Sequence, residues 1–337
     1  MEPFALIRPA NAESARLRVV GAPEQRHLRA AGVDLLDRLK EGLEAGKSVE
    51  LIELKAIAGA EGQALRAIGP AGDGLGLGAL VTLATIAASP ALPAPFAALR
   101  EAAGSAATPS VRNLATLGGN LLQRPRCWYF RSRDQHCLKK GGPACLAEGG
   151  ENKFHAILGG GPCHIVHPST LAVALLALGA EVTVLGAAGP RTLGIAELFA
   201  LPRVDVRRES TLDVGELLTE VRLPAPRPGQ RSTYEVAKEK RSHDWPLAEV
   251  AVSLVVDGGV IREPRVALGH VAPIPWRATA LEEALVGQRP SAELFADKAA
   301  LATQGARPMA QNAYKVPLAQ GLVRAALHRA CEIPIPE

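Results

Sequence analysis

Four of the five cysteines in this chain fall within one stretch of the sequence. They are Cys127, Cys137, Cys145 and Cys163, while the fifth, Cys331, lies near the C-terminus. The surrounding segment, residues 124–165, is rich in glycine and polar residues and shows no sustained period of apolar residues. A structureless segment of this length is uncommon in a compact domain unless it is functional. A bound metal would give it an organising centre.

The spacing of the four cysteines indicates the kind of metal. It is C-x9-C-x7-C-x17-C, without the closely spaced pairs of structural zinc sites. Four thiolates are the usual ligand set of a [2Fe–2S] or a [4Fe–4S] cluster. We therefore expect an iron–sulfur cluster, with a zinc site or four incidental thiols as the alternatives. Neighbouring histidines could also act as ligands, and neighbouring basic residues could offset the cluster's negative charge. These residues are His136, His155, His164 and His167, and Arg124, Arg126, Arg131, Arg133, Lys139 and Lys140.

Composition and charge exclude several classes of protein. The formal net charge is only +4 and no long Lys/Arg run is present, so nucleic-acid binding is not expected. No apolar stretch reaches about 18 residues, so membrane insertion is not expected. The N-terminus lacks the pattern of a secretory signal, which predicts a cytoplasmic location. Export of the folded chain with a signal-bearing partner, giving a periplasmic location, is the alternative.

Regular secondary structure is expected on both sides of the cysteine segment. The apolar pattern predicts strands and helices in alternation before it and again after it. The expected strands are 4–7, 49–54, 75–81, 181–185, 249–256 and 265–268, and the expected helices are 34–45, 82–88, 171–178 and others after about 278. The proline-rich segment 223–229 marks a domain boundary. The pattern as a whole is that of an α+β protein.

Two glycine-containing turns are candidates for contact with a phosphate. Residues 116–120 (TLGGN) could present consecutive backbone N–H groups to a diphosphate. Residues 30–35 (AAGVDL) read on their own as the start of a helix with Asp34 as the N-cap. Neither a P-loop nor a G-x-G-x-x-G turn after a strand is present, so a Rossmann nucleotide fold is not supported.

The segments SVRNLATLGGNLLQRPRC at 110–127 and ENKFHAILGGGPCHIVHPS at 151–169 carry a family resemblance. They resemble the FAD-binding medium subunit of the xanthine dehydrogenase, or molybdenum hydroxylase, family. Within it, the chain is similar to the periplasmic aldehyde oxidoreductase branch, whose flavin subunit has an extra [4Fe–4S] cluster in an inserted loop. The resemblance implies that Cys127, Cys137, Cys145 and Cys163 are the ligands of this cluster.

The resemblance also implies a fold. It predicts a two-subdomain FAD-binding region of the vanillyl-alcohol-oxidase (PCMH) type at residues 1–223, with subdomains at about 1–58 and 59–223. The iron–sulfur loop at 124–165 belongs to the second subdomain. A C-terminal α+β domain like that of the CO dehydrogenase flavoprotein would follow at 230–331.

Two loops and two further residues are implied to contact FAD. The first loop holds Ala30, Ala31, Gly32, Val33, Asp34, Leu35 and Leu36; the second holds Thr116, Gly118, Gly119 and Asn120; the further residues are Thr170 and Leu218. Three of these positions depart from the family pattern. Ala31 replaces a glycine, Val33 a threonine, and Thr170 the aspartate of an H-P-S-D motif.

The implied function is electron transfer. A molybdenum-cofactor large subunit would oxidise the substrate, and a small [2Fe–2S] subunit would pass the electrons to FAD in this chain and on to an external acceptor. No catalytic residue is expected here. The departures in the flavin site motivate an alternative, a flavin-free [4Fe–4S] relay or assembly scaffold in the same kind of complex.

Overall fold

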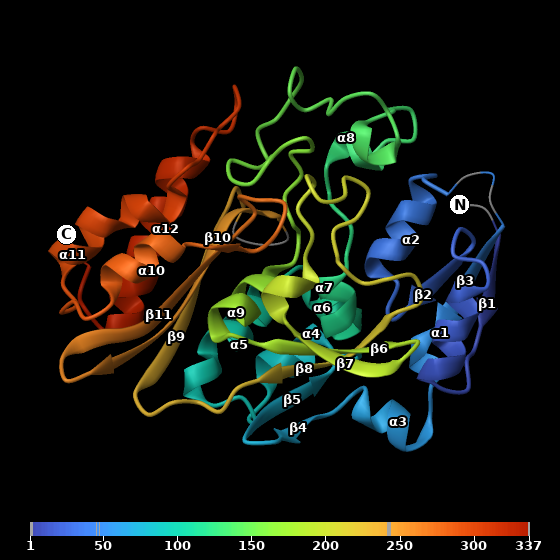
Figure 1. Cartoon of the computed structure of the whole chain (residues 1–337), viewed down its shortest axis with the longest axis horizontal. Coiled ribbons are helices and arrows are strands. Elements are labelled where there is room, and N and C mark those ends of the chain that lie inside the picture. The colour runs from blue at the N-terminus through green and yellow to red at the C-terminus, as the bar shows by residue number, and fades with distance from the viewer. Residues whose placement is uncertain (1–2, 45, 47, 241–243, 336–337) are drawn as a thin grey trace.

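The computed structural model describes residues 3–44, 46, 48–240 and 244–335. Residues 1–2, 45 and 47 of the expected first domain, including the last residue of the helix expected at 34–45, and residues 241–243 of the expected C-terminal domain therefore lie outside it. At the N-terminal end is a three-stranded parallel sheet in the order β1-β3-β2 (Figure 1). Parallel neighbours need crossover connections, which here contain the helices of this unit. The elements are β1 (Phe4–Ile7), α1 (Ala12–Val20), β2 (Arg26–Arg29), α2 (Val33–Lys40) and β3 (Val49–Glu53).

The middle of the molecule is a five-stranded antiparallel sheet in the order β4-β5-β8-β6-β7. Its strands are β4 (Ile68–Ala71), β5 (Gly74–Gly78), β6 (Glu181–Gly186), β7 (Gly189–Gly194) and β8 (Leu217–Leu223). Its helices are α3 (Gly59–Ala64), α4 (Leu83–Ala88), α5 (Ala97–Ser105), α6 (Pro109–Leu114), α7 (Leu117–Leu121) and α9 (Thr170–Leu178).

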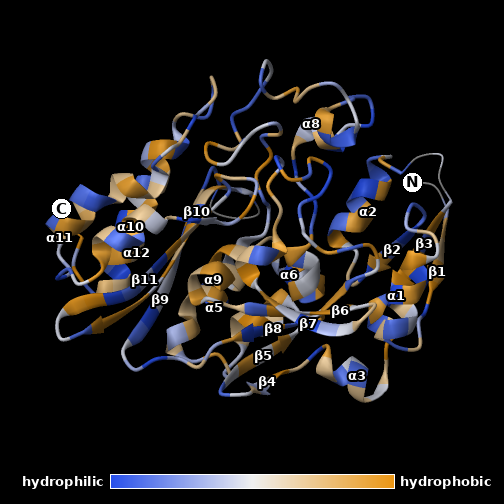
Figure 2. Cartoon of the chain, viewed as in Figure 1, coloured by the Kyte–Doolittle hydropathy of each residue, from blue (hydrophilic) through white to orange (hydrophobic). Residues whose placement is uncertain are grey.

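Helix α9 holds this unit against the C-terminal domain. All nine of its residues, TLAVALLAL, are buried, as a helix that is apolar on every side requires (Figure 2). It contacts α5 on one side and β10 and β11 on the other. The two units therefore share a continuous apolar interface.

The C-terminal domain is a four-stranded antiparallel sheet in the order β12-β11-β10-β9, covered by helices. Its elements are β9 (Gln230–Lys238), β10 (Pro246–Asp257), β11 (Val260–Gly269), β12 (Trp276–Arg277), α10 (Thr279–Leu285), α11 (Ala292–Lys298) and α12 (Lys315–Cys331). Helix α12 packs on β9 and β10. The proline-rich segment separates the end of β8 at Leu223 from the start of β9 at Gln230. Among the described residues, no helix combines the length and apolar character needed to cross a membrane.

The cysteine segment lies at the top of the view in Figure 1, and α8 (Trp128–Arg131) is its one α-helix among the described residues. Its second half is joined to the C-terminal domain. Lys315 is fully buried, and its Nζ donates to the carbonyls of Phe154 (2.9 Å) and His270 (2.7 Å). The side chain of Asn312 donates to the carbonyl of His155 (3.1 Å).

The expected α+β class is confirmed, and most expected elements form close to their predicted places. Two details were wrong. The helix expected at 34–45 ends at Lys40, where Glu41 is its C-cap and Gly42 follows with φ +75°. Asp34 is not the N-cap, because Gly32 takes that position in a left-handed conformation (φ +79°).

The ring of His167 is buried against the apolar core of the unit that holds the five-stranded sheet. It packs edge-on against Phe199, with 4.6 Å between ring centroids, and is buried. Burial, together with the nearby His270, lowers the pKa of His167 to about 3.

His167 should therefore make the fold sensitive to acid. Below the ordinary pKa of 6.5 the unfolded chain takes up a proton that folded His167 cannot, so stability falls as the pH falls. Between pH 6.5 and 5 this amounts to about 2 kcal/mol. Urea unfolding of native protein and His167→Gln at the two pH values should show an acid-induced loss smaller by about this amount in the variant. An equal loss in both proteins would refute the assignment.

Candidate functional site

The first glycine loop leads into α2 and faces a cleft between the two N-terminal subdomains. Gly32 adopts the left-handed conformation, and the first turn of α2 follows it. The first N–H groups of a helix have no partner within the helix, and they attract anions. Ala31 is not among the residues with positive φ, so the glycine it replaces is not required by backbone conformation. The replacement of glycine by Ala31 therefore leaves the backbone conformation of this loop unstrained.

The second glycine loop is fixed against the end of β5. The N–H of Gly118 donates to the carbonyl of Ala79 at 2.8 Å, and the N–H of Gly119 donates to Thr116 Oγ1 at 3.3 Å. A Cβ at Gly118 would lie 3.1 Å from Ala79 Cβ, so the glycine permits a close approach. Asn120 Oδ1 accepts from the Ser169 hydroxyl at 2.7 Å. Its oxygen therefore locks α7 onto the start of α9.

The cleft between these loops has a volume of about 670 Å³, which is within the range of small-molecule and cofactor sites. The structure brings together both loops and the two further positions, with one exception. The lining includes Ala30, Ala31, Gly32, Val33, Asp34, Leu35, Thr116, Gly118, Gly119, Asn120, Thr170 and Leu218. Leu36 is not part of it and lies instead against Gly32 and the small core under α2.

Thr170 lines the cleft, but its hydroxyl is directed to a buried carboxylate. It donates to Glu249 Oε1 at 2.8 Å, and Glu249 is fully buried on β10. His270 Nδ1 lies 3.5 Å from the same oxygen. Thr170, which stands where the family pattern has an aspartate, therefore has a neutral hydroxyl. The nearest acidic group is Glu249, which lies behind Thr170 and does not line the cleft.

The four clustered cysteines are free thiols; Cys137 and Cys163 are buried, and Cys127 and Cys145 are half-buried. The thiols of Cys145 and Cys163 are hydrogen-bonded, which lowers the pKa of Cys145 to about 6 and raises that of Cys163. Burial raises the pKa of Cys127 to about 11, and repulsion from Cys137 and Cys145 adds to this. Cys127, Cys137, Cys145 and Cys163 therefore lie within electrostatic range of at least one other member of the set.

Backbone N–H groups near three of these sulfurs act to lower their pKa values. They belong to Tyr129 and Phe130 near Cys127, to Ala147 and His164 near Cys145, and to Ile165 near Cys163. In addition, His155 Nε2 lies 3.2 Å from Cys127 Sγ. Donors of this kind stabilise thiolates, the form that binds metal. Among the described residues, no three or more His, Cys, Asp or Glu side chains are arranged to hold a single metal ion.

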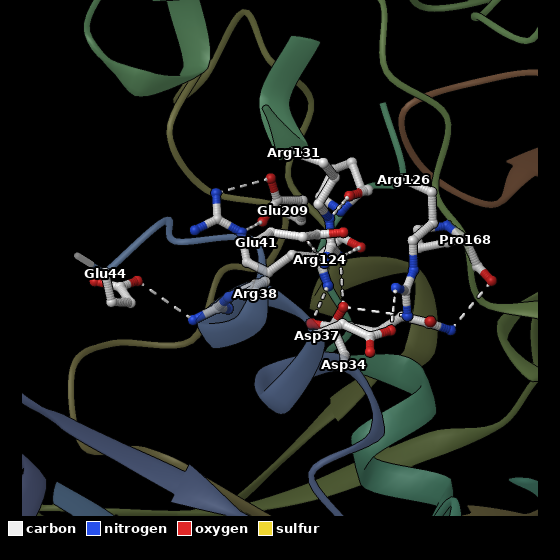
Figure 3. A network of polar contacts seen from close by, with 12 residues as sticks. Asp34, Asp37, Arg38, Glu41, Glu44, Arg124, Arg126, Arg131, Pro168 and Glu209 are labelled. Atoms are coloured by element: carbon white, nitrogen blue, oxygen red, sulfur yellow. Dashed lines mark hydrogen bonds and ion pairs between the residues drawn. The ribbon is translucent and has the colours of Figure 1, made fainter. Parts of the chain in front are cut away.

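Five of the six basic residues near the cysteines pair with carboxylates, and Lys140 instead donates to the carbonyl of Ser132. The Arg124 Nη2 donates to Glu209 at 3.2 Å (Figure 3), and Lys139 Nζ forms an ion pair with the same carboxylate at 2.5 Å. Asp34 accepts from Arg131 Nη2 (2.5 Å), and Arg126 lies 3.3 Å from the same oxygen. Burial acts to raise the pKa of Asp34, but these two arginines outweigh it and hold the pKa below its usual value.

Two further residues of the cleft were missed by sequence reasoning. The Arg126 guanidinium lies 4.9 Å from the ring centre of Trp245, and both side chains line the cleft. Their contact joins the cysteine segment to the C-terminal domain across the cleft. Arg126 was noticed only as a neighbour of Cys127, and nothing in the sequence pattern linked it to Trp245.

The fold and the cleft together define a dinucleotide-binding protein of two domains. Residues 2–226 match the family described as the FAD binding domain in molybdopterin dehydrogenase, and residues 232–330 match the CO dehydrogenase flavoprotein C-terminal domain. The chain belongs to this family of FAD-binding subunits of molybdopterin dehydrogenases.

Its similarity to known members extends over nearly the whole chain. It is 34% identical over 327 residues to the aldehyde oxidoreductase FAD-binding subunit PaoB of Escherichia coli K12, covering 96% of this chain and 95% of that protein. It is 26% identical to the carbon monoxide dehydrogenase medium chain of Hydrogenophaga pseudoflava, covering 90% and 88%. A solved structure of carbon monoxide dehydrogenase from that organism superposes with a TM-score of 0.74, at 26% identity and 99% coverage of both chains.

The left-handed Gly32 makes a direct test of the FAD cradle possible. Gly32→Ala adds about 1 kcal/mol of backbone strain, and its Cβ would lie 2.9 Å from the Arg29 side chain. The shift of the loop should weaken FAD binding roughly tenfold, by about 1.4 kcal/mol. Flavin fluorescence titration of the deflavinated protein measures this.

Gly72→Ala is the matched control. Gly72 also has positive φ (+63°), and no heavy atom lies within 4 Å of its added Cβ. It lies in the turn between β4 and β5, away from the cleft lining. It should carry a similar cost in stability with unchanged FAD affinity. Equal FAD affinity in both variants would contradict the cradle.

Proposed function

We propose that this chain is an electron-transfer subunit that binds FAD in the cleft and a [4Fe–4S] cluster at Cys127, Cys137, Cys145 and Cys163. A molybdenum-cofactor large subunit and a [2Fe–2S] small subunit would supply the electrons, which leave to an external acceptor. When bound, FAD exchanges electrons in pairs with one neighbour and singly with another, and the cluster carries one at a time. The protein's own residues bind and orient these groups and exclude water.

The observation that supports the cluster proposal is the presence of four cysteines in one segment, whose thiols and nearby backbone N–H groups influence one another's pKa values. Hydrogen bonds to sulfur are a feature by which proteins stabilise and tune iron–sulfur clusters. A single tetrahedral metal would need its thiolates within roughly 4 Å of one another. In a cubane each thiolate binds a different iron, so the sulfurs are more widely spread. The wide spacing of the four cysteines, without closely spaced pairs, therefore supports the cluster over zinc.

The flavin proposal is supported by the intact backbone of both loops. Gly32 keeps the left-handed conformation, and Gly118 keeps its close approach to Ala79. The alternative, a flavin-free cluster relay or scaffold, was motivated by Ala31, Val33 and Thr170. Ala31 needs no glycine conformation, and Val33 begins α2 as an ordinary helical residue.

We also propose domain boundaries from the positions of the three sheets. The FAD-binding region takes residues 1–223, with subdomains dividing near residue 58, between the end of β3 and the start of α3. The iron–sulfur loop takes 124–165. The C-terminal domain takes 230–331, beginning with β9 and ending with α12.

The cluster proposal predicts a specific loss of iron. Cys137→Ser and Cys163→Ser in the intact complex should each remove about four irons and four sulfides per chain and leave the remaining iron in place. Iron, acid-labile sulfide, zinc and extracted FAD are measured on the same anaerobic samples. FAD at about one per chain supports the flavin subunit, and its absence supports the flavin-free alternative.

Cys331→Ser is the matched control. Cys331 is equally a buried cysteine, but it lies in α12 within the core of the C-terminal domain. Its substitution should leave the metal content unchanged. Zinc without sulfide, or iron content indifferent to Cys137 and Cys163, would refute the cluster.

A further inference from the structure

Asp34 belongs to the first glycine loop, but its carboxylate accepts hydrogen bonds from residues of the cysteine segment. Asp34 lines the cleft in the first turn of α2, and its side chain is only 15% exposed. One oxygen accepts from the Arg131 guanidinium, and the other accepts from the backbone N–H of Arg124 at 3.1 Å. Arg126 lies 3.3 Å away (Figure 3). Every one of these donors comes from residues 124–131.

The same residues hold the first cysteine. Cys127 is the N-cap of α8, and Arg131 is the last residue of this one-turn helix. Arg131 is 7% exposed and also donates to the carbonyl of Pro125 (2.7 Å) and pairs with Glu41 (3.1 Å). Because Cys127 and Arg131 lie at the two ends of the same helical turn, fixing the position of Cys127 also fixes the position of Arg131.

The charges around α2 make this contact matter for FAD. Asp34, Asp37 and Glu41 are three acidic residues on the helix whose N-terminus faces the cleft, and FAD carries a diphosphate of the same sign. An unpaired Asp34 carboxylate in the first turn would repel that diphosphate. When Asp34 is paired with Arg131 and Arg126, its charge is neutralised and this repulsion is removed.

We propose that Arg131, aided by Arg126, is a positioning residue that couples the two cofactor sites, so that an ordered cysteine loop strengthens FAD binding by neutralising Asp34. The inference rests on the proposed FAD and cluster sites. Coupling between binding sites is reciprocal, so bound FAD also helps the cluster loop to stay ordered. Loss of the cluster, which frees Cys127 and α8, weakens FAD binding through the loss of these arginine contacts.

A double-mutant cycle in the intact complex tests the coupling. Arg131→Met should weaken FAD binding roughly tenfold, the size typical of coupled sites. In the Asp34→Asn background there is no carboxylate to neutralise, so the same substitution should change the FAD dissociation constant by less than about threefold. Arg131→Lys keeps the charge and should restore most of the affinity. The dissociation constants are measured by flavin fluorescence after deflavination.

Arg133→Met is the matched control, because Arg133 belongs to the same segment but is 68% exposed and pairs with Asp134. It should leave FAD affinity unchanged. Equal effects of Arg131→Met in both backgrounds, or no effect in either, would overturn the coupling, as would failure of the lysine variant to restore affinity.

Iron analysis of the same samples separates this inference from the cluster proposal. A coupled cycle in protein that holds iron supports both, and Cys127→Ser should then weaken FAD binding as Arg131→Met does. A coupled cycle in protein without cluster iron would refute the cluster and leave the Arg131–Asp34 link standing. An additive cycle in iron-loaded protein would refute the link alone.

Discussion

The cysteine segment has little core of its own, and its fixed position depends on polar contacts with three neighbours. Arg131 and Arg126 bind α2 of the first subdomain, and Arg124 and Lys139 bind Glu209 of the second. On the far side, Lys315 and Asn312 of the C-terminal domain hold its backbone carbonyls. The proposed cluster would add an organising centre to this segment.

Asp34 is where these contacts meet the flavin site. A carboxylate in the first turn of a helix is normally favourable, because it faces the positive end of the helix dipole. Beside a bound diphosphate the same negative charge would repel the ligand. Whether Asp34 favours or opposes binding therefore depends on the groups that neutralise its charge. The arginines that do so belong to the loop that carries Cys127. The cleft-lining start of α2 and the segment that carries Cys127, distant in sequence, thereby share one buried ion-pair network.

Much of this organisation was predictable from the sequence, and the reasons for the failures are physical. The apolar run 171–178 and the alternating strands are local signals, so α9 and the sheets were found near their true limits. The two glycine turns were found from their composition. Asp34 was misread as an N-cap because that role is local, whereas its actual partners, Arg124 and Arg131, lie about 90 residues away. The Arg126–Trp245 contact and the hydrogen bond from Thr170 to Glu249 likewise depend on tertiary packing, which the spacing of residues in the sequence does not reveal.

The most direct test of the account is native mass spectrometry of the purified chain released anaerobically from its complex. The main species should carry one FAD and one [4Fe–4S] cluster, and Arg131→Met should hold a smaller fraction of FAD while it keeps the cluster. A main species carrying a zinc ion, or no inorganic cofactor at the four cysteines, would contradict it.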